Sequence, residues 1–431
     1  MHVSEPLPRL TTAQAAARLG VKPATLYAYV SRGRIRSTRC ETGGSTFDAL
    51  EVEELAAARR SGRVVAPASS ANRTQGRPLM VLGSPLTLIE DDELYFRGVR
   101  ATDLARTCTV EEAIEFLWTA GVSNGPPAPG VEPVVVARAS QAGDLLGPSA
   151  RSIDRMQIAV TIAGTHDPFR TELNPEGART AGRQIVAIVV DALPDLGKPA
   201  PLTAPLAHRL WPKLTAQPAT AADLDLIAAA LVLCLDHDLA TATLAARVAA
   251  TARAHPYAAV ASALAAFDAA LHGSASIAAV QMLRDVLGPT RPERAVAEHV
   301  AGGSGVPGFG HVLYRRTDPR AAFLFDAMAA MPRYELAINA AQQVGAVIAP
   351  RTGRPANLDL ALAVMAIGAD MSADAGQVLF ATARTAGWIA HIADEYSQAP
   401  LRLRPESHYT GPRPDGASHR AAEGAPWPRP N

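Results

Sequence analysis

The sequence predicts an all-α protein, and three observations support this fold class. Aromatic residues make up only 5% of the chain although hydrophobic residues reach 48%, because Ala and Leu supply most apolar positions. Both residues lose little side-chain freedom in a helix. Apolar residues recur at helical spacing in segments such as 221–238 and 255–273, and no series of alternating residues predicts a sheet. The 431 residues suffice for two or three such domains.

Charge and cysteine content exclude several classes of protein. Basic and acidic residues balance at 41 each, so no overall field attracts the chain to nucleic acid or membrane, and any nucleic-acid contact must be local. The cysteines Cys40, Cys108 and Cys234 are odd in number and lack CxxC spacing, which argues against disulfides and zinc. The longest apolar run, Leu226–Leu235, is far shorter than the ~20 residues that cross a bilayer. We expect a cytoplasmic protein without bound metal.

The N-terminal residues predict two short helices around a tight turn. Thr11 and Gln14 fit a capping box, and Pro23 suits the first turn of a helix, where its missing N–H is not needed. Gly20 and Gly33 fall where the two helices should end. A small shared core is expected from Leu19, Val21, Leu26, Val30 and Ile35.

This pattern resembles the helix-turn-helix of MerR-type and excisionase-type DNA-binding domains, with segment 38–60 as the wing and the next helix. Up to Val65 there are ten Lys/Arg against six Asp/Glu. Four arginines follow the second helix, where they can meet DNA phosphates: Arg32, Arg34, Arg36 and Arg39. The alternative is a module used for protein contacts.

The chain divides into four predicted parts. Residues 1–64 form the helix-turn-helix domain, and residues 65–77, rich in small and polar side chains, form a linker. Residues 78–412 form a large helical region. Residues 413–431, rich in Pro, Arg and Gly, form a disordered tail.

Four ionisable residues of the large region stand at the end of an apolar helix or in a Gly-rich turn. They are His237, His272, His311 and Asp359. Ionisable groups beside apolar helix ends are places where pKa values shift and where function concentrates. Each is weak evidence alone, because an isolated histidine is more often structural.

Taken together, their order and flanking residues resemble the citrate synthase family over about three quarters of the chain. The matching elements are the Y-x-R-G element at Tyr95–Gly98, the segment at His237, the LHG turn at His272, the G-x-G-H…DPR element at 308–320, and segments around Arg384 and Arg404. The resemblance implies a large helical domain with an inserted small helical domain near 274–370, a site in the cleft between them, and a homodimer.

The resemblance also implies roles for the site residues. Asp359 would be the base that takes a methyl proton from an acyl-CoA, His272 would donate to the thioester oxygen, and His311 would protonate the keto oxygen of oxaloacetate. Oxaloacetate would be held by His237 and by guanidinium groups on its carboxylates, those of Arg320, Arg384 and, from the partner subunit, Arg404. Arg315 would meet a CoA phosphate and Phe380 would line the acyl site. No cofactor would be permanently bound, since the acyl-CoA is a co-substrate.

Several positions depart from the family pattern. They are Asp238 after the first histidine, Ala269-Ala270 before the LHG turn, 274–276 after it, and 360–362 after the aspartate. These changes lie beside the reacting groups rather than at them, so substrate choice stays open between acetyl-CoA and propionyl-CoA, the donor of a 2-methylcitrate synthase. The helix-turn-helix domain motivates another alternative, a DNA-binding sensor of these metabolites without turnover. Retention of Asp359 favours catalysis, because a sensor has no need of a base.

Overall fold

The computed structural model describes residues 7–40, 43–61, 81–121, 130–269, 272–303, 305–405 and 411. The predicted linker 65–77 and tail 413–431 lie outside the described residues. Within those that are described, helices dominate and the strands are short, which confirms the predicted all-α class with a small N-terminal winged domain. None of the helices described is long and apolar enough to cross a membrane.

The N-terminal domain combines three helices with a three-stranded antiparallel sheet of order β1-β3-β2. The predicted capping box is present, because the Thr11 amide donates to Gln14 Oε1 at 2.9 Å and the Gln14 amide donates to Thr11 Oγ1 at 3.3 Å. Leu26 is fully buried between the helices, and Phe47 is fully buried from the sheet. The elements are β1 (Arg9–Thr11), α1 (Thr12–Leu19), α2 (Pro23–Ser31), β2 (Ser37–Arg39), β3 (Ser45–Asp48) and α3 (Ala49–Ser61).

A second small antiparallel sheet precedes the helices of the large region, and the sequence analysis did not anticipate it. Its strands are β4 (Thr87–Glu90), β5 (Glu93–Phe96) and β6 (Val99–Arg100), in the order β4-β5-β6. Strands this short contain too few residues to show an alternating pattern. Two residues with positive φ, Asp91 and Asp92, make the turn between β4 and β5.

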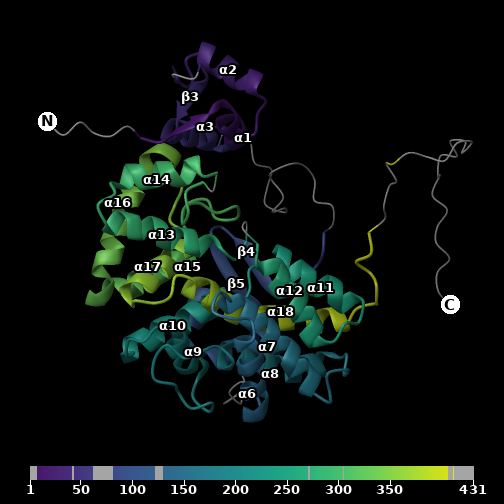
Figure 1. The fold of residues 1–431 in the computed structure, drawn as a ribbon. Helices are drawn as coiled ribbons and strands as arrows, with labels where there is room; N and C mark the ends of the chain where they lie inside the picture. The colour runs from purple at the N-terminus through teal and green to yellow at the C-terminus, as the bar shows by residue number, and fades with distance from the viewer. Residues whose placement is uncertain are drawn as a thin grey trace, which may run out of the picture.

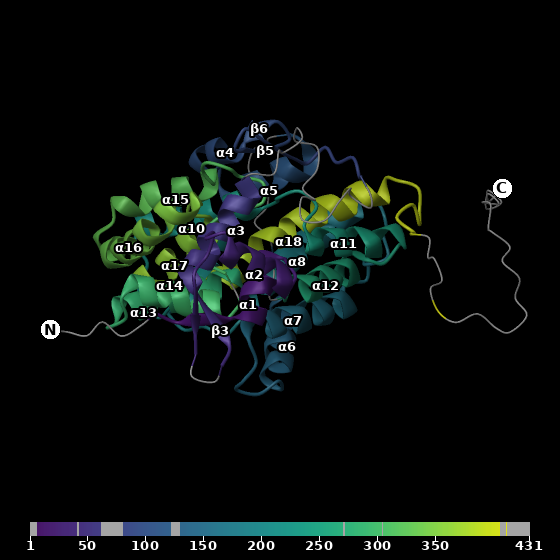
Figure 2. The ribbon, with the colours of Figure 1, turned by 90° about the horizontal axis from the view of Figure 1, so that it is seen from above.

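The helices of the large region pack around α18 (Ala375–Tyr396), a long helix that is buried along most of its length. Figure 2 shows it in yellow beside α11 and above α8, helices with which it makes extensive contact. The other elements are α4 (Ala101–Thr107), α5 (Val110–Thr119), α6 (Pro133–Asp144), α7 (Ser152–His166), α8 (Pro175–Asp191), α9 (Leu206–Leu214), α10 (Ala221–Cys234), α11 (Thr241–Thr251), α12 (Pro256–Phe267), α13 (Ala275–Leu287), α14 (Pro292–Ala301), α15 (Pro319–Ala329), the 3-10 helix η1 (Pro332–Tyr334), α16 (Glu335–Thr352) and α17 (Leu358–Gly368).

The N-terminal domain sits on one end of the helical region. Figure 1 shows α3 against α14 and α16, while α2 lies on the outer side of the domain. Helix α3 contacts α14 and α16 about as extensively as it contacts α1 of its own domain. The small domain is therefore packed against the large region as well as covalently joined to it.

Candidate active site

The loop before His311 is bound directly to the start of α17, the helix that begins beside Asp359. Asn357 caps this helix, because its Oδ1 accepts from the Asp359 amide at 3.0 Å, and its Nδ2 donates to the Gly310 carbonyl oxygen at 2.9 Å. Gly308 and Gly310 have φ of +81° and +83°, values that residues other than glycine rarely adopt. A Cβ at Gly308 would also lie 2.8 Å from the Leu360 side chain. This close approach holds the two predicted catalytic segments together.

His237 and His311 meet edge to face beside a tyrosine. Their ring centroids lie 5.0 Å apart at an interplanar angle of 81°, and Nε2 of His237 lies 2.9 Å from the Tyr314 hydroxyl. No role for Tyr314 was expected from the sequence, although this residue stands three positions after His311 in the most distinctive string of the chain. Nδ1 of His311 accepts from the Leu313 amide at 3.0 Å, so in the neutral ring the proton is on Nε2.

All three predicted site histidines are held neutral at physiological pH. Burial, together with the nearby cation of Arg320, lowers the pKa of His311 to about 4. Burial, together with the nearby cation of Arg384, lowers the pKa of His272 to about 4. Burial, with the nearby Arg320, also lowers the pKa of His237 well below its ordinary value. A neutral imidazole keeps one N–H group, and it can donate this N–H to a developing oxyanion.

His272 presents a polar atom that the described side chains leave unsatisfied. Its Nε2 is buried and has no hydrogen-bond partner among the residues described, and its ring packs edge-on against Phe267 at 5.2 Å between centroids. A buried polar atom without a partner is costly, so it marks a place where a ligand atom can bind.

Asp359 has the properties of a base. Burial raises the pKa of its carboxyl to about 6; Arg320 partly opposes this shift and Asp318 reinforces it. A carboxylate with a raised pKa accepts a proton more readily than an ordinary one, yet it remains largely ionised at pH 7.

Two buried guanidinium groups, those of Arg320 and Arg384, lie close enough to His237 to lower its pKa. Arg320 binds Asp318 through Nε at 3.0 Å and Nη2 at 2.8 Å; burial opposes its charge, but Asp318 outweighs burial and raises the pKa of Arg320. Arg384 donates from Nε to the Cys234 carbonyl oxygen at 3.1 Å, while its buried Nη2 has no hydrogen-bond partner among the described residues. Burial lowers the pKa of Arg384. A carboxylate ligand would satisfy this Nη2 and offset the buried charge.

Phe380 contacts both Arg384 and Phe267, the ring against which His272 packs. Its ring stacks on Phe267 at 5.4 Å, and the guanidinium carbon of Arg384 lies 4.6 Å from its centroid. Phe380 therefore supplies an apolar surface next to Arg384.

Arg315 and Arg404 are placed differently from the other predicted site residues, because both are exposed. The backbone amide of Arg315 donates to Asp92 Oδ1 at 2.5 Å, which ties the loop after His311 to the hairpin between β4 and β5. Arg404 follows α18, next to Leu403, which is buried. Their assigned roles need a CoA molecule and a second subunit, and stay predictions.

A buried network that the sequence analysis missed holds the residue before His237. Asp236 accepts a hydrogen bond from Thr87 Oγ1 at 2.5 Å, and its carboxylate lies 3.1 Å from Nε2 of His391. Nδ1 of His391 in turn lies 2.9 Å from Arg247 Nη1. Burial alone would raise the pKa of Asp236, but His391 and Arg384 outweigh burial and lower it. The turn that positions His237 is thus anchored to α18 and α11.

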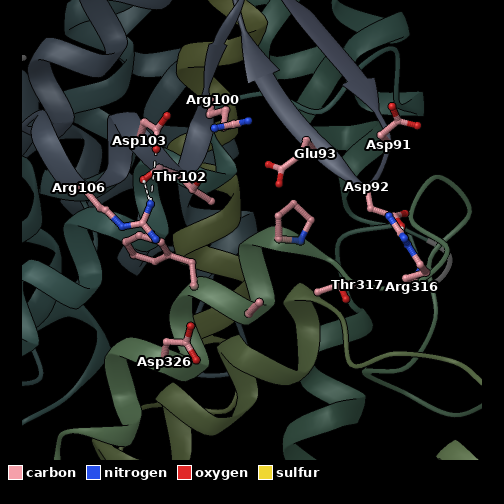
Figure 3. A pocket seen from close by; sticks show the side chains of 13 residues that line it. Asp91, Asp92, Glu93, Arg100, Thr102, Asp103, Arg106, Arg316, Thr317 and Asp326 are labelled. Atoms are coloured by element: carbon pink, nitrogen blue, oxygen red, sulfur yellow. Dashed lines mark hydrogen bonds and ion pairs between the residues drawn. The ribbon is translucent and has the colours of Figure 1, made fainter.

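A cavity of about 720 Å³ is lined in part by Arg316 and Thr317 of the loop that connects His311 to α15. Figure 3 shows Asp92 and Arg316 at one end of this cavity and Asp103 with Arg106 at the other, facing Asp326. Charges of both signs line it, and they pair locally: Arg316 Nε lies 3.2 Å from Asp92 Oδ2. No group of His, Cys, Asp and Glu with the arrangement of a metal site occurs among the residues described.

Comparison with known proteins gives two family matches. The family described as "Citrate synthase, C-terminal domain" matches residues 77–406, and the family described as "Helix-turn-helix domain" matches residues 9–60.

Relatives and solved structures agree with the longer match. Citrate synthase 2 of Bacillus subtilis is 24% identical over 76% of this chain and 93% of its own length. The 2-methylcitrate synthase 1 of Corynebacterium glutamicum is 25% identical over 75% of this chain and 90% of its own. The Thermotoga maritima citrate synthase structure has a TM-score of 0.64 at 23% identity, covering 78% of this chain and 94% of that one. The Thermoplasma acidophilum citrate synthase, in ternary complex with carboxymethyl coenzyme A and oxaloacetate, has a TM-score of 0.65 at 21% identity, covering 80% and 97%.

The matched family spans most of the chain, and the solved structures share its fold. The helix-turn-helix match explains the additional N-terminal domain. The chain therefore belongs to the citrate synthase family of acyltransferases, and a helix-turn-helix domain precedes its citrate synthase region.

Proposed function

We propose that the protein condenses acetyl-CoA with oxaloacetate to give citrate and CoA. The observation that carries this proposal is the bond of Asn357 to Gly310, which joins the start of the helix that holds Asp359 to the residue before His311. The Asp359 carboxyl has a raised pKa, and His272 and His311 have lowered pKa values that keep them neutral. Abstraction of a proton from a thioester methyl group needs a base together with a donor for the developing enolate oxygen. Both kinds of group are present, and Asp359, His272 and His311 are all half-buried.

The proposed reaction proceeds in three steps. Asp359 takes a proton from the methyl carbon while Nε2 of His272 donates to the thioester oxygen, which leaves a nucleophilic carbon. This carbon attacks the keto carbon of oxaloacetate, and His311 gives its Nε2 proton to the keto oxygen as the C–C bond forms. The proton taken up by Asp359 then restores neutral His311 and the Asp359 carboxylate. Water then hydrolyses the citryl thioester, which releases citrate and CoA.

Oxaloacetate binding is assigned to His237, Arg320 and Arg384. Both guanidinium groups are buried, and the buried Nη2 of Arg384 is suited to a carboxylate oxygen. Arg320 already holds Asp318, so its remaining N–H groups would meet the substrate. We assign Arg404 to the second carboxylate of the neighbouring subunit's substrate, which makes the active form a homodimer, and Arg315 to a CoA phosphate.

Propionyl-CoA is the second candidate donor, because 2-methylcitrate synthases of Corynebacterium glutamicum are as similar to the chain, at 25% and 26% identity, as the citrate synthases named above. One methylene group changes selectivity by only ~1–3 kcal/mol, so a small change in the apolar wall near Phe380 decides it.

The helix-turn-helix domain is proposed to bind DNA. Its helix α2 is largely exposed, as are Arg32 and Arg34 after it. Arg36 differs, because its Nε donates to Glu51 Oε1 at 2.9 Å, so it is already partly neutralised. Arg32 and Arg34 are therefore better candidates for phosphate contacts than Arg36.

Release of CoA by the purified chain tests the proposed reaction. We expect release from acetyl-CoA only when oxaloacetate is present, and a slower reaction with propionyl-CoA. Faster turnover of propionyl-CoA would assign the 2-methylcitrate reaction instead. No turnover of either donor by folded, dimeric protein would favour a metabolite sensor.

A further inference from the structure

The N-terminal domain contacts the segment that leads into the His311 loop. Gln14 Nε2 donates to the Ala301 carbonyl oxygen at 3.2 Å, at the end of α14. The guanidinium of Arg18 lies against Gly305, where an added Cβ would be 2.6 Å from Arg18 Nη2. Gly305 and the residues after it form the loop that ends at His311, so the small domain borders an element of the proposed site.

Glu53 of α3 is the buried carboxylate of this interface. Its side chain is only 1% exposed, and it pairs with Arg18 of its own domain and with Arg354 of the large region, whose Nη1 lies 3.7 Å from Glu53 Oε2. A carboxylate buried at this depth is tolerated because cations compensate its lost hydration. One of those cations comes from the other domain, so the pair links the domains electrostatically.

Arg354 lies directly over the backbone beside His311. An added Cβ at Gly310 would be 3.0 Å from Arg354 Cδ and 3.3 Å from its Cγ, so the side-chain stem covers this glycine. Pro355, the next residue, accepts from the Gly310 amide at 2.8 Å. The Arg354 side chain thus covers one face of the loop, while the segment that follows Arg354 binds the backbone of that loop.

The same segment continues to Asp359, in the first turn of α17. The Asn357 amide donates to the Gly308 carbonyl oxygen at 2.9 Å, and Asn357 then caps the helix that begins beside Asp359. Segment 354–357 therefore connects the backbone beside His311, the proposed acid, to that of Asp359, the proposed base. Glu53 forms an ion pair with the first residue of this segment, Arg354.

We infer that Glu53 and Arg354 are positioning residues for the condensation, and that the N-terminal domain is thereby part of the active-site scaffold. This inference rests on the proposed function. Neither side chain need touch substrate, because the ion pair acts by fixing segment 354–357. A misplacement of about 1 Å at reacting groups can reduce a rate by roughly 10²-fold, so a modest loosening of this segment is enough to be measured.

Kinetics of matched variants test the inference in the full-length protein. Glu53→Gln and Arg354→Gln should each lower kcat by about tenfold with little change in KM for oxaloacetate, because binding groups stay in place. Arg354→Lys should recover part of the loss. The control is Glu54→Gln, at the adjacent exposed position of α3, which should match the parent. Because the ion pair is shared, the double variant should be no slower than either single one.

Glu53→Gln also removes a partner of Arg18, so Arg354→Gln, which leaves the interior of the small domain unchanged, is the decisive variant. Hydrogen exchange of the Gly310 and Asn357 amides reports positioning without any turnover, and we expect faster exchange in Arg354→Gln than in the parent or Glu54→Gln. If the parent itself has no turnover, the proposed function fails while exchange still decides the positioning role. Parent-like kcat and parent-like exchange in Arg354→Gln would overturn the inference.

Discussion

Nδ2 of Asn357 donates a hydrogen bond to the carbonyl oxygen of Gly310 at 2.9 Å. This bond joins the cap of the helix that begins beside Asp359 to the residue that precedes His311. Asp359, the proposed base, and His311, the proposed acid, are therefore positioned by one shared hydrogen-bonded backbone, although they are far apart in sequence.

Replacement of Asn357 by Ala should lower kcat by roughly 10- to 100-fold, because it removes both the cap and the bond to the His311 loop. The matched control is Asn174→Ala, which removes an equivalent cap from α8, where Asn174 Oδ1 accepts from the Gly177 amide at 2.8 Å. Both variants should lose about 1 kcal/mol of stability. Steady-state kinetics and denaturant unfolding of the two variants check this, and equal activity in both would contradict the shared support.

Replacement of Tyr314 by Phe should weaken oxaloacetate binding, because the Tyr314 hydroxyl lies within hydrogen-bond distance of His237 Nε2 and helps to orient the ring. A net hydrogen bond of ~0.5–1.5 kcal/mol corresponds to a rise in KM of about 2- to 12-fold. Tyr257→Phe is the control, since the buried hydroxyl of Tyr257, a residue of α12, donates to Asp167 Oδ2 at 2.8 Å. A KM that rises equally in both variants would indicate a general loss of packing rather than a role for Tyr314.

The candidate site residues His237, His272, His311 and Asp359 could be proposed from the sequence because each stands in a distinctive local string. The structure places His237 against His311, and the roles assigned to the four residues stay predictions. The capping box of Thr11 and Gln14 was predictable for the same reason, since it is a local pattern. Contacts between distant segments were not. Asp236 and His391, or Glu53 and Arg354, carry no signal at either position that indicates the partner, because only the packing of α18 and α3 brings them together. The β4–β5 hairpin was missed because its strands are too short to show a period.

The pH dependence of kcat should report the base. The pKa of Asp359 is raised to about 6, and only the ionised carboxylate can accept a proton, so kcat should fall as pH drops through about 6 and reach a plateau above about pH 7. His272 and His311, with pKa values of about 4, remain neutral over this range and add no second limb above pH 5. Initial rates between pH 5 and 8 measure the curve. An acidic limb centred near 4 would exclude a buried Asp359 as the group that limits the rate.

DNA affinity should fall steeply with salt if Arg32 and Arg34 contact phosphates. Each contact contributes a slope of about −0.9 in the logarithm of affinity against the logarithm of salt concentration, so Arg32→Gln and Arg34→Gln should each flatten the slope by about that amount. Arg36→Gln should change it less, because Arg36 is paired with Glu51. Fluorescence anisotropy with duplex DNA over a range of salt measures these slopes. Failure of the parent to bind any duplex at low salt would leave the domain with a protein-contact role.

The most direct test of the proposed chemistry compares the parent with Asp359→Asn, using Asp326→Asn, an exposed position on α15, as the control. Oxaloacetate-dependent CoA release and the dissociation constant for oxaloacetate are measured on the same preparations. We expect turnover of Asp359→Asn to fall by at least ~10²–10⁴-fold, because the base is lost, while oxaloacetate binds as it does to the parent. His237→Ala and Arg320→Ala should instead weaken oxaloacetate binding. Near-parental turnover by Asp359→Asn would contradict the assignment of the base, and with it the mechanism.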